Sequence, residues 1–432
     1  MIRKRFRRIK MKKAFVNGII LDGTADMQPV EGKVIIVDGD RITEIADSAP
    51  ADCLIIDLGG KYIMPGLINL HVHIPANGKP KKKATDYEKL GGLLKYNVVR
   101  RVVYAMCESY IKDELYSGTT TIRAVGGVLD FDTKLRDRIN AGKAVGPRII
   151  ACDYGVSVPG GHMTGTVALP AHSEDEAVKM VEELHALGVD QIKLMITGGV
   201  LDADVPGEPG VLRMPESYVK AACGKAHELG HKVAAHVEST EGMLVALRNG
   251  VDTIEHGGRP DEETIALFKE KGAVLVATLS PALPFSIMAP EVSGVDEVGY
   301  INGKALFANM LECIKECRAN GIKVGLGTDV GCPFTTHYNM WRELYWYQKF
   351  IGVSAAECIY SATGLNAEIA GIADDVGTIQ PGRSADFIVL RGNPLEDLSA
   401  LRNPDSVFFK GRKVNGKPKK FDAVETALDA LM

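Results

Sequence analysis

Short apolar runs alternate with longer amphipathic segments through the central part of the chain. The runs are bounded by glycine, proline or polar turns, which is typical of buried strands. They lie at 67–73, 119–125, 148–152, 190–195, 232–236, 252–256, 273–278 and 323–329. Most follow a segment of helical periodicity that ends in glycine, such as 177–188 and 306–321. Eight strands that alternate with helices predict an α/β protein in which residues 65–370 form a (β/α)8 TIM barrel.

Both ends of the chain have the pattern of short strands joined by tight turns. Residues 13–62 contain three apolar or alternating runs, and 377–389 and 406–414 repeat this pattern. Because neither end has enough strands to be stable alone, we predict one small β-sandwich domain built from 13–64 and 371–432. Residues 1–12 form a basic segment with no apolar stretch behind it, which predicts a disordered tail rather than a signal peptide.

The composition is that of an ordinary globular protein. Of the 432 residues 46% are hydrophobic and 25% charged, and the net charge is −4. This charge gives no reason to expect nucleic acid or an anionic membrane as partner, and no apolar run approaches the ~18–20 residues of a membrane span. The 8 cysteines form no Cys-x-x-Cys pair, so neither a disulfide framework nor a thiolate zinc site is indicated. We expect a cytoplasmic homo-oligomer that acts on a small molecule.

Side chains that bind metals lie at the predicted C-terminal ends of the strands. His71 and His73 are separated by one residue, so their side chains point to the same face of a strand. His236, His256 and Asp329 end three further predicted strands, and the strand at 190–195 carries Lys193. The C-terminal ends of the strands line the mouth of a (β/α)8 barrel. Four imidazoles and a carboxylate at that mouth predict a site for zinc or a similar divalent ion.

Lys193 leaves two interpretations open. A lysine within a barrel strand is a costly buried charge, and pairing with a carboxylate would offset that cost. Alternatively, reaction with CO₂ makes it an N6-carboxylated lysine, which is an anion able to bridge two metal ions.

Six segments resemble, in order along the chain, those of a known family. They are Pro-Gly-Leu-Ile-Asn-Leu-His-Val-His (65–73), Gln-Ile-Lys-Leu-Met (191–195), Ala-Ala-His-Val-Glu (234–238), Thr-Ile-Glu-His-Gly (253–257), Gly-Thr-Asp-Val-Gly (327–331) and Gly-Thr-Ile-Gln-Pro-Gly-Arg-Ser-Ala-Asp-Phe (377–387). Together they are similar to the binuclear-metal amidohydrolases of the amidohydrolase superfamily. The similarity spans nearly the whole chain.

The resemblance implies two divalent ions, which we expect to be Zn²⁺, and a carboxylated Lys193. One ion would be held by His71, His73, Lys193 and Asp329, and the other by Lys193, His236 and His256. A hydroxide that bridges the two ions would attack the substrate carbonyl, because paired metals lower the pKa of shared water. Asp329 would accept the hydroxide's proton and return it to the leaving amine.

The loop 159–165 and the segment 193–200 resemble those of Xaa-Pro and Xaa-Arg/Lys dipeptidases and of imidazolonepropionase-like relatives. In that group the histidine that matches His162 contacts the substrate near the scissile carbonyl. Glu238 departs from the group, since the dipeptidases carry a tyrosine there that helps to hold the terminal carboxylate. A carboxylate at this place is expected to hold a substrate ammonium, to support a ligand imidazole or to face water.

Several other side chains are candidates for substrate contact. Arg213 would anchor a substrate carboxylate or stay a solvated charge. His337, Tyr338 and Tyr87 are candidates for the pocket wall, and the loop 78–83 is a candidate lid or a solvated loop.

We therefore expect a metal-dependent hydrolase that cleaves the amide bond of a dipeptide or N-acyl amino acid. The alternatives are a cyclic amide or lactone hydrolase, a deaminase on the same scaffold, or a binding protein that has lost its metals. Lys193 argues against the deaminase, since those relatives bind one metal and have no bridging lysine. The filled ligand positions argue against the binding protein.

Overall fold

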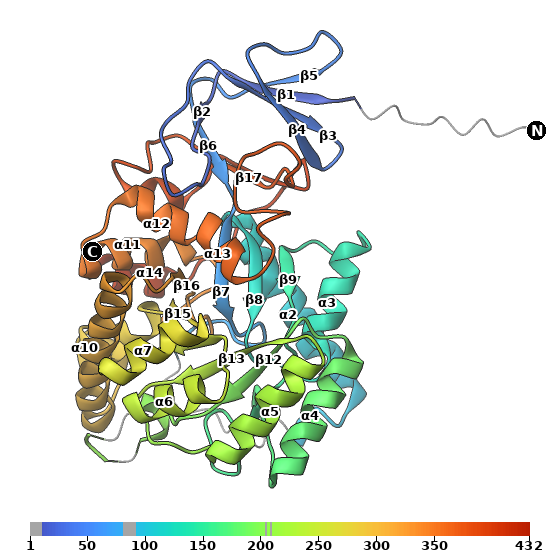
Figure 1. Ribbon diagram of the computed structural model, residues 1–432. Coiled ribbons are helices and arrows are strands. Elements are labelled where there is room, and N and C mark those ends of the chain that lie inside the picture. The colour runs from blue at the N-terminus through green and yellow to red at the C-terminus, as the bar shows by residue number, and fades with distance from the viewer. Residues whose placement is uncertain (1–10, 81–91, 204, 208–209) are drawn as a thin grey trace, which may run out of the picture.

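The computed structural model describes residues 11–80, 92–203, 205–207 and 210–432 (Figure 1). Most of the predicted tail, Tyr87 and the later part of the candidate lid lie outside the described residues. None of the described helices combines the length and the apolar composition needed to cross a membrane.

Parallel strands form the centre of the molecule, as predicted for an α/β fold. One sheet contains β7 (Leu67–Val72), β8 (Thr119–Ala124) and β9 (Arg148–Ile150). The other has the order β11 (Ala168–Pro170), β10 (Gly155–Ser157), β12 (Gln191–Met195), β13 (Lys232–Val237), β14 (Thr253–His256), β15 (Val274–Ala277) and β16 (Val324–Leu326). All eight predicted strands are present, and β10 and β11 are two further short strands.

Backbone contacts connect both edges of the three-stranded sheet to the seven-stranded sheet. The carbonyl of Ala151, next to β9, accepts hydrogen bonds from Asp190 N at 2.8 Å and Gln191 N at 3.3 Å, where β12 begins. At the other edge, the Asp329 N–H donates to the carbonyl of His71 in β7 at 2.9 Å. Val72 and Val330 form a parallel bridge beside it. The chain just after β16 therefore lies against the end of β7.

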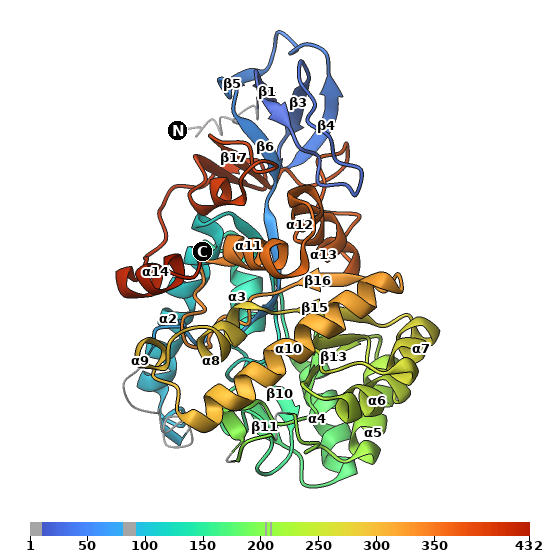
Figure 2. The same ribbon diagram turned by 90° about the vertical axis from the view of Figure 1, so that its left-hand side faces the viewer.

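Helices pack around these strands (Figures 1 and 2). Their bounds are α2 (Asn97–Tyr116), α3 (Phe131–Asn140), α4 (Glu174–Leu187), α5 (Glu216–Glu228), α6 (Thr240–Arg248), α7 (Glu262–Lys271), α8 (Leu283–Ser286), α9 (Pro290–Ser293), α10 (Glu297–Ala319), α11 (Met340–Ile351), α12 (Ala355–Ser361), α13 (Gly364–Ile369) and α14 (Asp422–Asp429). Short 3₁₀ turns span Val200–Asp202, Ser280–Ala282 and Leu398–Arg402. Helix α4 begins at the N-cap Ser173, whose side chain accepts from Glu176 N, and ends at Gly188 with φ of 79°. The left-handed conformation of Gly188 agrees with the prediction that this helix ends at a glycine.

The two ends of the chain meet in one sheet, where the blue and red segments lie together in Figures 1 and 2. Its order is β19 (Arg412–Lys413), β18 (Ser406–Phe409), β17 (Phe387–Leu390), β6 (Tyr62–Pro65) and β2 (Ile19–Ile20). A second sheet has the order β4 (Arg41–Ala46), β3 (Val34–Asp38), β1 (Lys13–Val16) and β5 (Leu54–Asp57). Phe15 packs edge-on against Phe387 and Phe408, with ring centroids 5.5 and 5.0 Å away. The domain boundaries and the sandwich arrangement remain predictions.

Candidate active site

Two histidines and an aspartate meet where β7, β14 and β16 end. Potential ligand atoms of His71, His256 and Asp329 all lie within 4.8 Å of one another, and all three side chains are buried. Oδ1 of Asp329 lies 3.4 Å from Nε2 of His71 and 3.3 Å from Nε2 of His73. The other ring nitrogen of His73 donates to the carbonyl of Gly126 at 2.9 Å, which fixes the ring orientation. The pair at the end of β7 thus converges as the spacing predicted.

His256 reaches this cluster through an unusual backbone conformation. Its ring centroid is 4.8 Å from that of His71 and 4.7 Å from that of His236. The preceding residue, Glu255, also faces the cluster, although neighbouring side chains on a strand ordinarily point to opposite faces. His256 has φ of 70° and Asp329 has φ of 55°, in the left-handed region that non-glycine residues seldom adopt. Such strain costs about 1–3 kcal/mol and is concentrated at functional sites.

Lys193 of β12 and His236 of β13 add two buried nitrogen atoms that could ligate a metal ion. Within the described part of the chain, neither Lys193 Nζ nor His236 Nε2 has a hydrogen-bond partner. Burial lowers the pKa of Lys193 to about 8, and it lowers the pKa of His71 to about 4. The pKa of His236 lies well below its usual value for the same reason. A buried amine without a partner is unfavourable, so an additional group that binds these nitrogens fits the site.

Asp329 has the opposite protonation preference. Burial opposes ionisation of its carboxyl, but His71 and His73 outweigh burial and place the pKa well below the usual value. Burial thus favours the neutral form of the His71 and His236 imidazoles, whereas the carboxyl of Asp329 favours the ionised form. These are the protonation states in which side chains ligate metal ions.

Glu255 and Arg123 support the cluster, a role that no motif in the sequence indicated. Glu255 Oε2 lies 2.8 Å from Nδ1 of His71, and Glu255 Oε1 accepts from Nη2 of Arg123 at 2.7 Å. Burial raises the pKa of Glu255, but Arg123 and His71 hold it below its usual range. Arg123 also donates to the carbonyl of Leu70 at 2.7 Å. The sequence did contain a signal for this contact. Arg123 and Glu255 are opposite charges within two apolar strands, and a buried charge requires a partner.

His162 lies beside His236, with its ring stacked at a centroid distance of 3.9 Å and an interplanar angle of 11°. Its Nδ1 lies 2.5 Å from Oδ2 of Asp202, and the same oxygen accepts from Gly199 N at 2.8 Å. Burial opposes ionisation of Asp202, but the bond with His162 lowers the pKa of that carboxyl below its usual value. Asp202 therefore holds the ring with Nε2 left for other contacts. No pattern in the sequence assigned this role to Asp202.

Glu238 lies at the same mouth. Its Oε1 is 3.8 Å from Nε2 of His236, and its side chain is buried. Burial and the nearby charges of Asp202 and Asp329 raise the pKa of this carboxyl well above its usual value.

The remaining candidates for substrate contact lie in different surroundings. Arg213 is exposed, and its charge contributes to the lowered pKa of Asp202. His337 is buried, with Nδ1 3.1 Å from Glu114 and Nε2 2.7 Å from the carbonyl of Ala76. The Tyr338 hydroxyl accepts from Phe421 N at 2.8 Å, where α14 begins. These partners of His337 and Tyr338 lie outside the histidine cluster. The substrate contacts of Arg213, His337 and Tyr338 stay predictions.

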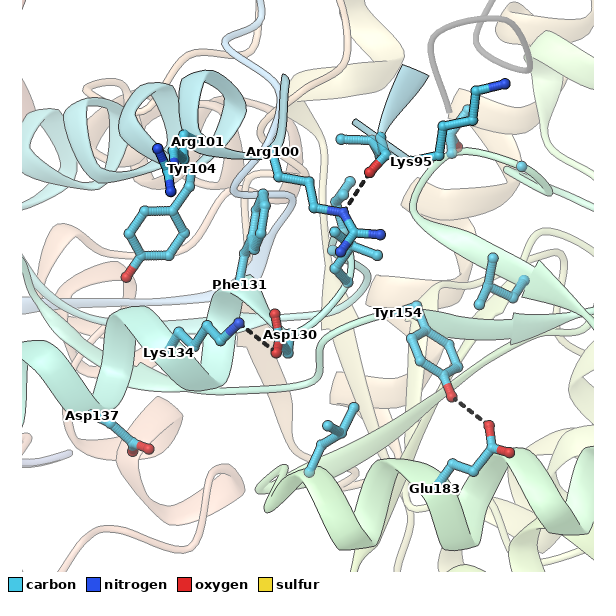
Figure 3. Close-up of a pocket in the computed structure, with 18 of the residues that line it drawn as sticks. Lys95, Arg100, Arg101, Tyr104, Asp130, Phe131, Lys134, Asp137, Tyr154 and Glu183 are labelled. Carbon is cyan, nitrogen blue, oxygen red and sulfur yellow. Dashed lines mark hydrogen bonds and ion pairs between the residues drawn. The ribbon is translucent and has the colours of Figure 1, made fainter. Parts of the chain in front are cut away.

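A cavity of about 1380 Å³ opens between α2, α3 and α4 (Figure 3). Figure 3 shows Tyr154 directed toward Glu183, at 3.4 Å, and Lys134 paired with Asp130 at 2.7 Å. The described residues that line this cavity include none of the candidate metal ligands. This cavity is therefore separate from the cluster of candidate metal ligands.

Comparisons with known proteins agree with this geometry. The chain matches the model of the amidohydrolase family over residues 62–414. A candidate prolidase of Bifidobacterium longum is 32% identical, with a TM-score of 0.85 over 98% of this chain and 99% of that one. A Xaa-Pro dipeptidase with bound methionine is 30% identical, with a TM-score of 0.82 over 94% and 100% of the two chains.

A curated relative extends the comparison. The ochratoxinase of Aspergillus niger is 25% identical over 439 residues, which cover 92% of this chain and 85% of that protein. The relatives and the buried cluster support hydrolysis of an amide or other C–N bond. The chain belongs to the amidohydrolase family.

Proposed function

We propose that the protein is a metal-dependent hydrolase that cleaves the amide bond of a small substrate, either a dipeptide or an N-acyl amino acid. The observation that carries this proposal is the convergence of His71, His256 and Asp329 within 4.8 Å, beside buried nitrogens that have no partner in the described chain. The similarity to a Xaa-Pro dipeptidase supports the substrate class.

We also propose that the eight parallel strands form a closed (β/α)8 barrel. The hydrogen bonds from Asp190 and Gln191 to Ala151, and from Asp329 to His71, join both edges of the three-stranded sheet to the larger sheet and support closure. In a closed barrel the ends of β7, β12, β13, β14 and β16 face one mouth, where active sites of this fold lie.

The donor set fits two divalent ions, for which we propose zinc. The residues that would hold one ion are His71, His73, Lys193 and Asp329, and those that would hold the other are Lys193, His236 and His256. When bound, such ions polarise a carbonyl and make water a nucleophile at neutral pH. Nitrogen and carboxylate donors suit zinc.

Lys193 would serve both ions as a carboxylated lysine. The neutral amine attacks CO₂, a new N–C bond forms, and one proton is released. The pKa of about 8 supports this step, because a share of the side chain is then neutral at physiological pH. Burial supports it as well, since a bridging anion would pair with metal charge in a site closed to water.

Asp329 would move the proton during hydrolysis. Its Oδ1 faces His71 and His73, while Oδ2 lies 3.6 Å from the Cys332 thiol. Oδ2 would take a proton from the attacking water and return it to the nitrogen of the leaving amine. His162, held by Asp202, would place Nε2 against the substrate carbonyl.

A substrate screen tests the proposal. Zinc-loaded protein is incubated with dipeptides and N-acyl amino acids, and product amino acids are quantified by chromatography, with chelator-treated protein in parallel. We expect release from a subset of compounds that is lost on chelation. The absence of release from every compound, or equal release after chelation, would overturn the proposal.

A further inference from the structure

The cavity between α2, α3 and α4 has an apolar wall and room for a ligand. Its volume is about 1380 Å³, beyond the roughly 300–1,000 Å³ of most small-molecule sites. Apolar side chains reach it from the loops after β8 and β9, from β11 and from α4, and they include Leu129, Phe131, Tyr154, Leu169 and Leu187. Leu169 and Leu187 are 42% and 43% exposed, so the fold leaves their apolar surface to water. A ligand with an apolar body would cover that surface.

One wall of the cavity is held in a strained shape. Leu129 has φ of 55°, a left-handed conformation that bulky residues rarely adopt. The Gly127 N–H donates to the carbonyl of Asp153 at 2.5 Å. A Cβ at position 127 would lie 2.7 Å from both carboxylate oxygens of Asp132, so the loop packs tightly there. Backbone strain of this kind is concentrated at functional sites.

The carboxylates in the described lining already have partners. Figure 3 shows Lys134 turned toward Asp130 and the Tyr154 hydroxyl turned toward Glu183. The recorded ion pairs of the three carboxylates are Asp130 with Lys134 at 2.7 Å, Asp137 with Arg136 at 3.0 Å and Glu183 with Lys179 at 3.7 Å. These carboxylates therefore do not compensate the remaining basic side chains of the cavity.

Basic side chains outnumber carboxylates in the described lining by five to three, and they are Lys95, Arg100, Arg101, Lys134 and Arg138. Figure 3 shows Arg100 extending from α2 toward the middle of the cavity. Its Nε donates to the carbonyl of Leu94, which leaves the N–H groups of both Nη atoms for a ligand. Among the described residues, Arg100 and Arg101 have no recorded ion pair. The charge around the cavity thus favours an anion.

We propose that this cavity binds an amphipathic carboxylate, with the carboxylate on Arg100 and the apolar body over Leu169 and Leu187. A planar guanidinium matches a carboxylate, since parallel N–H groups can donate to both of its oxygens. A monoanion suits the cavity better than a phosphate dianion, because three carboxylates line the same space and repel negative charge. The inference is independent of the proposed hydrolysis, since the described lining contains no candidate metal ligand.

The test measures binding of octanoate to zinc-loaded protein by isothermal titration calorimetry. Octanoate should bind wild type, and its affinity should fall about 10-fold in Arg100→Gln, because a charge-assisted hydrogen bond is lost. Leu187→Gln, which changes the apolar wall alone, should also weaken binding, by about 3-fold. The matched control is Arg412→Gln, an exposed arginine in β19, which should bind as wild type does.

Two further ligands separate the contributions of charge and apolar surface. Acetate lacks the apolar body and octanol lacks the carboxylate, so each should bind wild type at least about 10-fold more weakly than octanoate. Octanol or acetate that binds as tightly as octanoate would overturn the inference. Equal affinity of wild type and Arg100→Gln would also overturn it, because the carboxylate would then bind elsewhere, such as at the metal ions. The same holds if wild type binds no octanoate, or if Arg412→Gln loses as much affinity as Arg100→Gln.

Discussion

Single residues determine how the site is assembled, and one of them departs from simple strand geometry. Period-two alternation predicts that Glu255 and His256 face opposite sides of β14. The positive φ of 70° at His256 turns its ring back to the cluster, so both residues serve one site. Glu255 then anchors His71, and His256 is itself within hydrogen-bond distance of Thr278 at 2.6 Å.

Asp202 provides a test at this scale. Its bond to Nδ1 of His162 sets the tautomer and the orientation of the ring. In Asp202→Asn we expect kcat on a cleaved dipeptide to fall by about 10- to 100-fold, because a charge-assisted hydrogen bond is lost, with a smaller change in KM. Steady-state kinetics check this, with the exposed Asp175→Asn as control. An unchanged kcat would show that Asp202 does not position His162.

At the scale of elements, the C-terminal helix α14 docks through buried charge. Arg342 of α11 is 1% exposed, and its Nη2 lies 3.2 Å from Glu425 and 2.7 Å from Asp429. Arg402 joins the same two carboxylates at 2.8 and 2.9 Å. The two acidic residues are four apart on one helix face, so both reach the guanidinium groups. Their exposure differs, at 10% for Glu425 and 41% for Asp429.

This difference predicts unequal effects on stability. Glu425→Gln should lower the free energy of unfolding by roughly 3 kcal/mol, because it leaves the buried guanidinium poorly paired. Asp429→Asn should cost less than about 1 kcal/mol, since its carboxylate is largely solvated. Urea denaturation of both variants gives the comparison. If the two variants lose equal stability, burial of the Arg342 pair does not hold α14 in place.

At the scale of the whole molecule, the sequence predicted the features that local residue patterns encode, and it missed contacts between distant segments. The eight strands followed from short apolar runs. The prediction that His71, His236, His256 and Asp329 share one mouth with Lys193 rested on their positions at the ends of strands and on Lys193 within a strand, and their roles as ligands stay predictions. Glu255 and Arg123 were missed because they meet only when β8 and β14 are brought together, and no local pattern encodes that contact. The surroundings of His337 and Tyr338 depend in the same way on distant segments, including Phe421.

The central claim is that Lys193 holds the metal ions on which amide hydrolysis depends. The most direct test is the zinc content per chain of wild type and Lys193→Ala after loading in the presence of CO₂. We predict about two zinc ions for wild type and a clear loss in the variant that short carboxylic acids partly restore, while the exposed Lys220→Ala stays at the wild-type level. Full zinc content in Lys193→Ala would contradict the account.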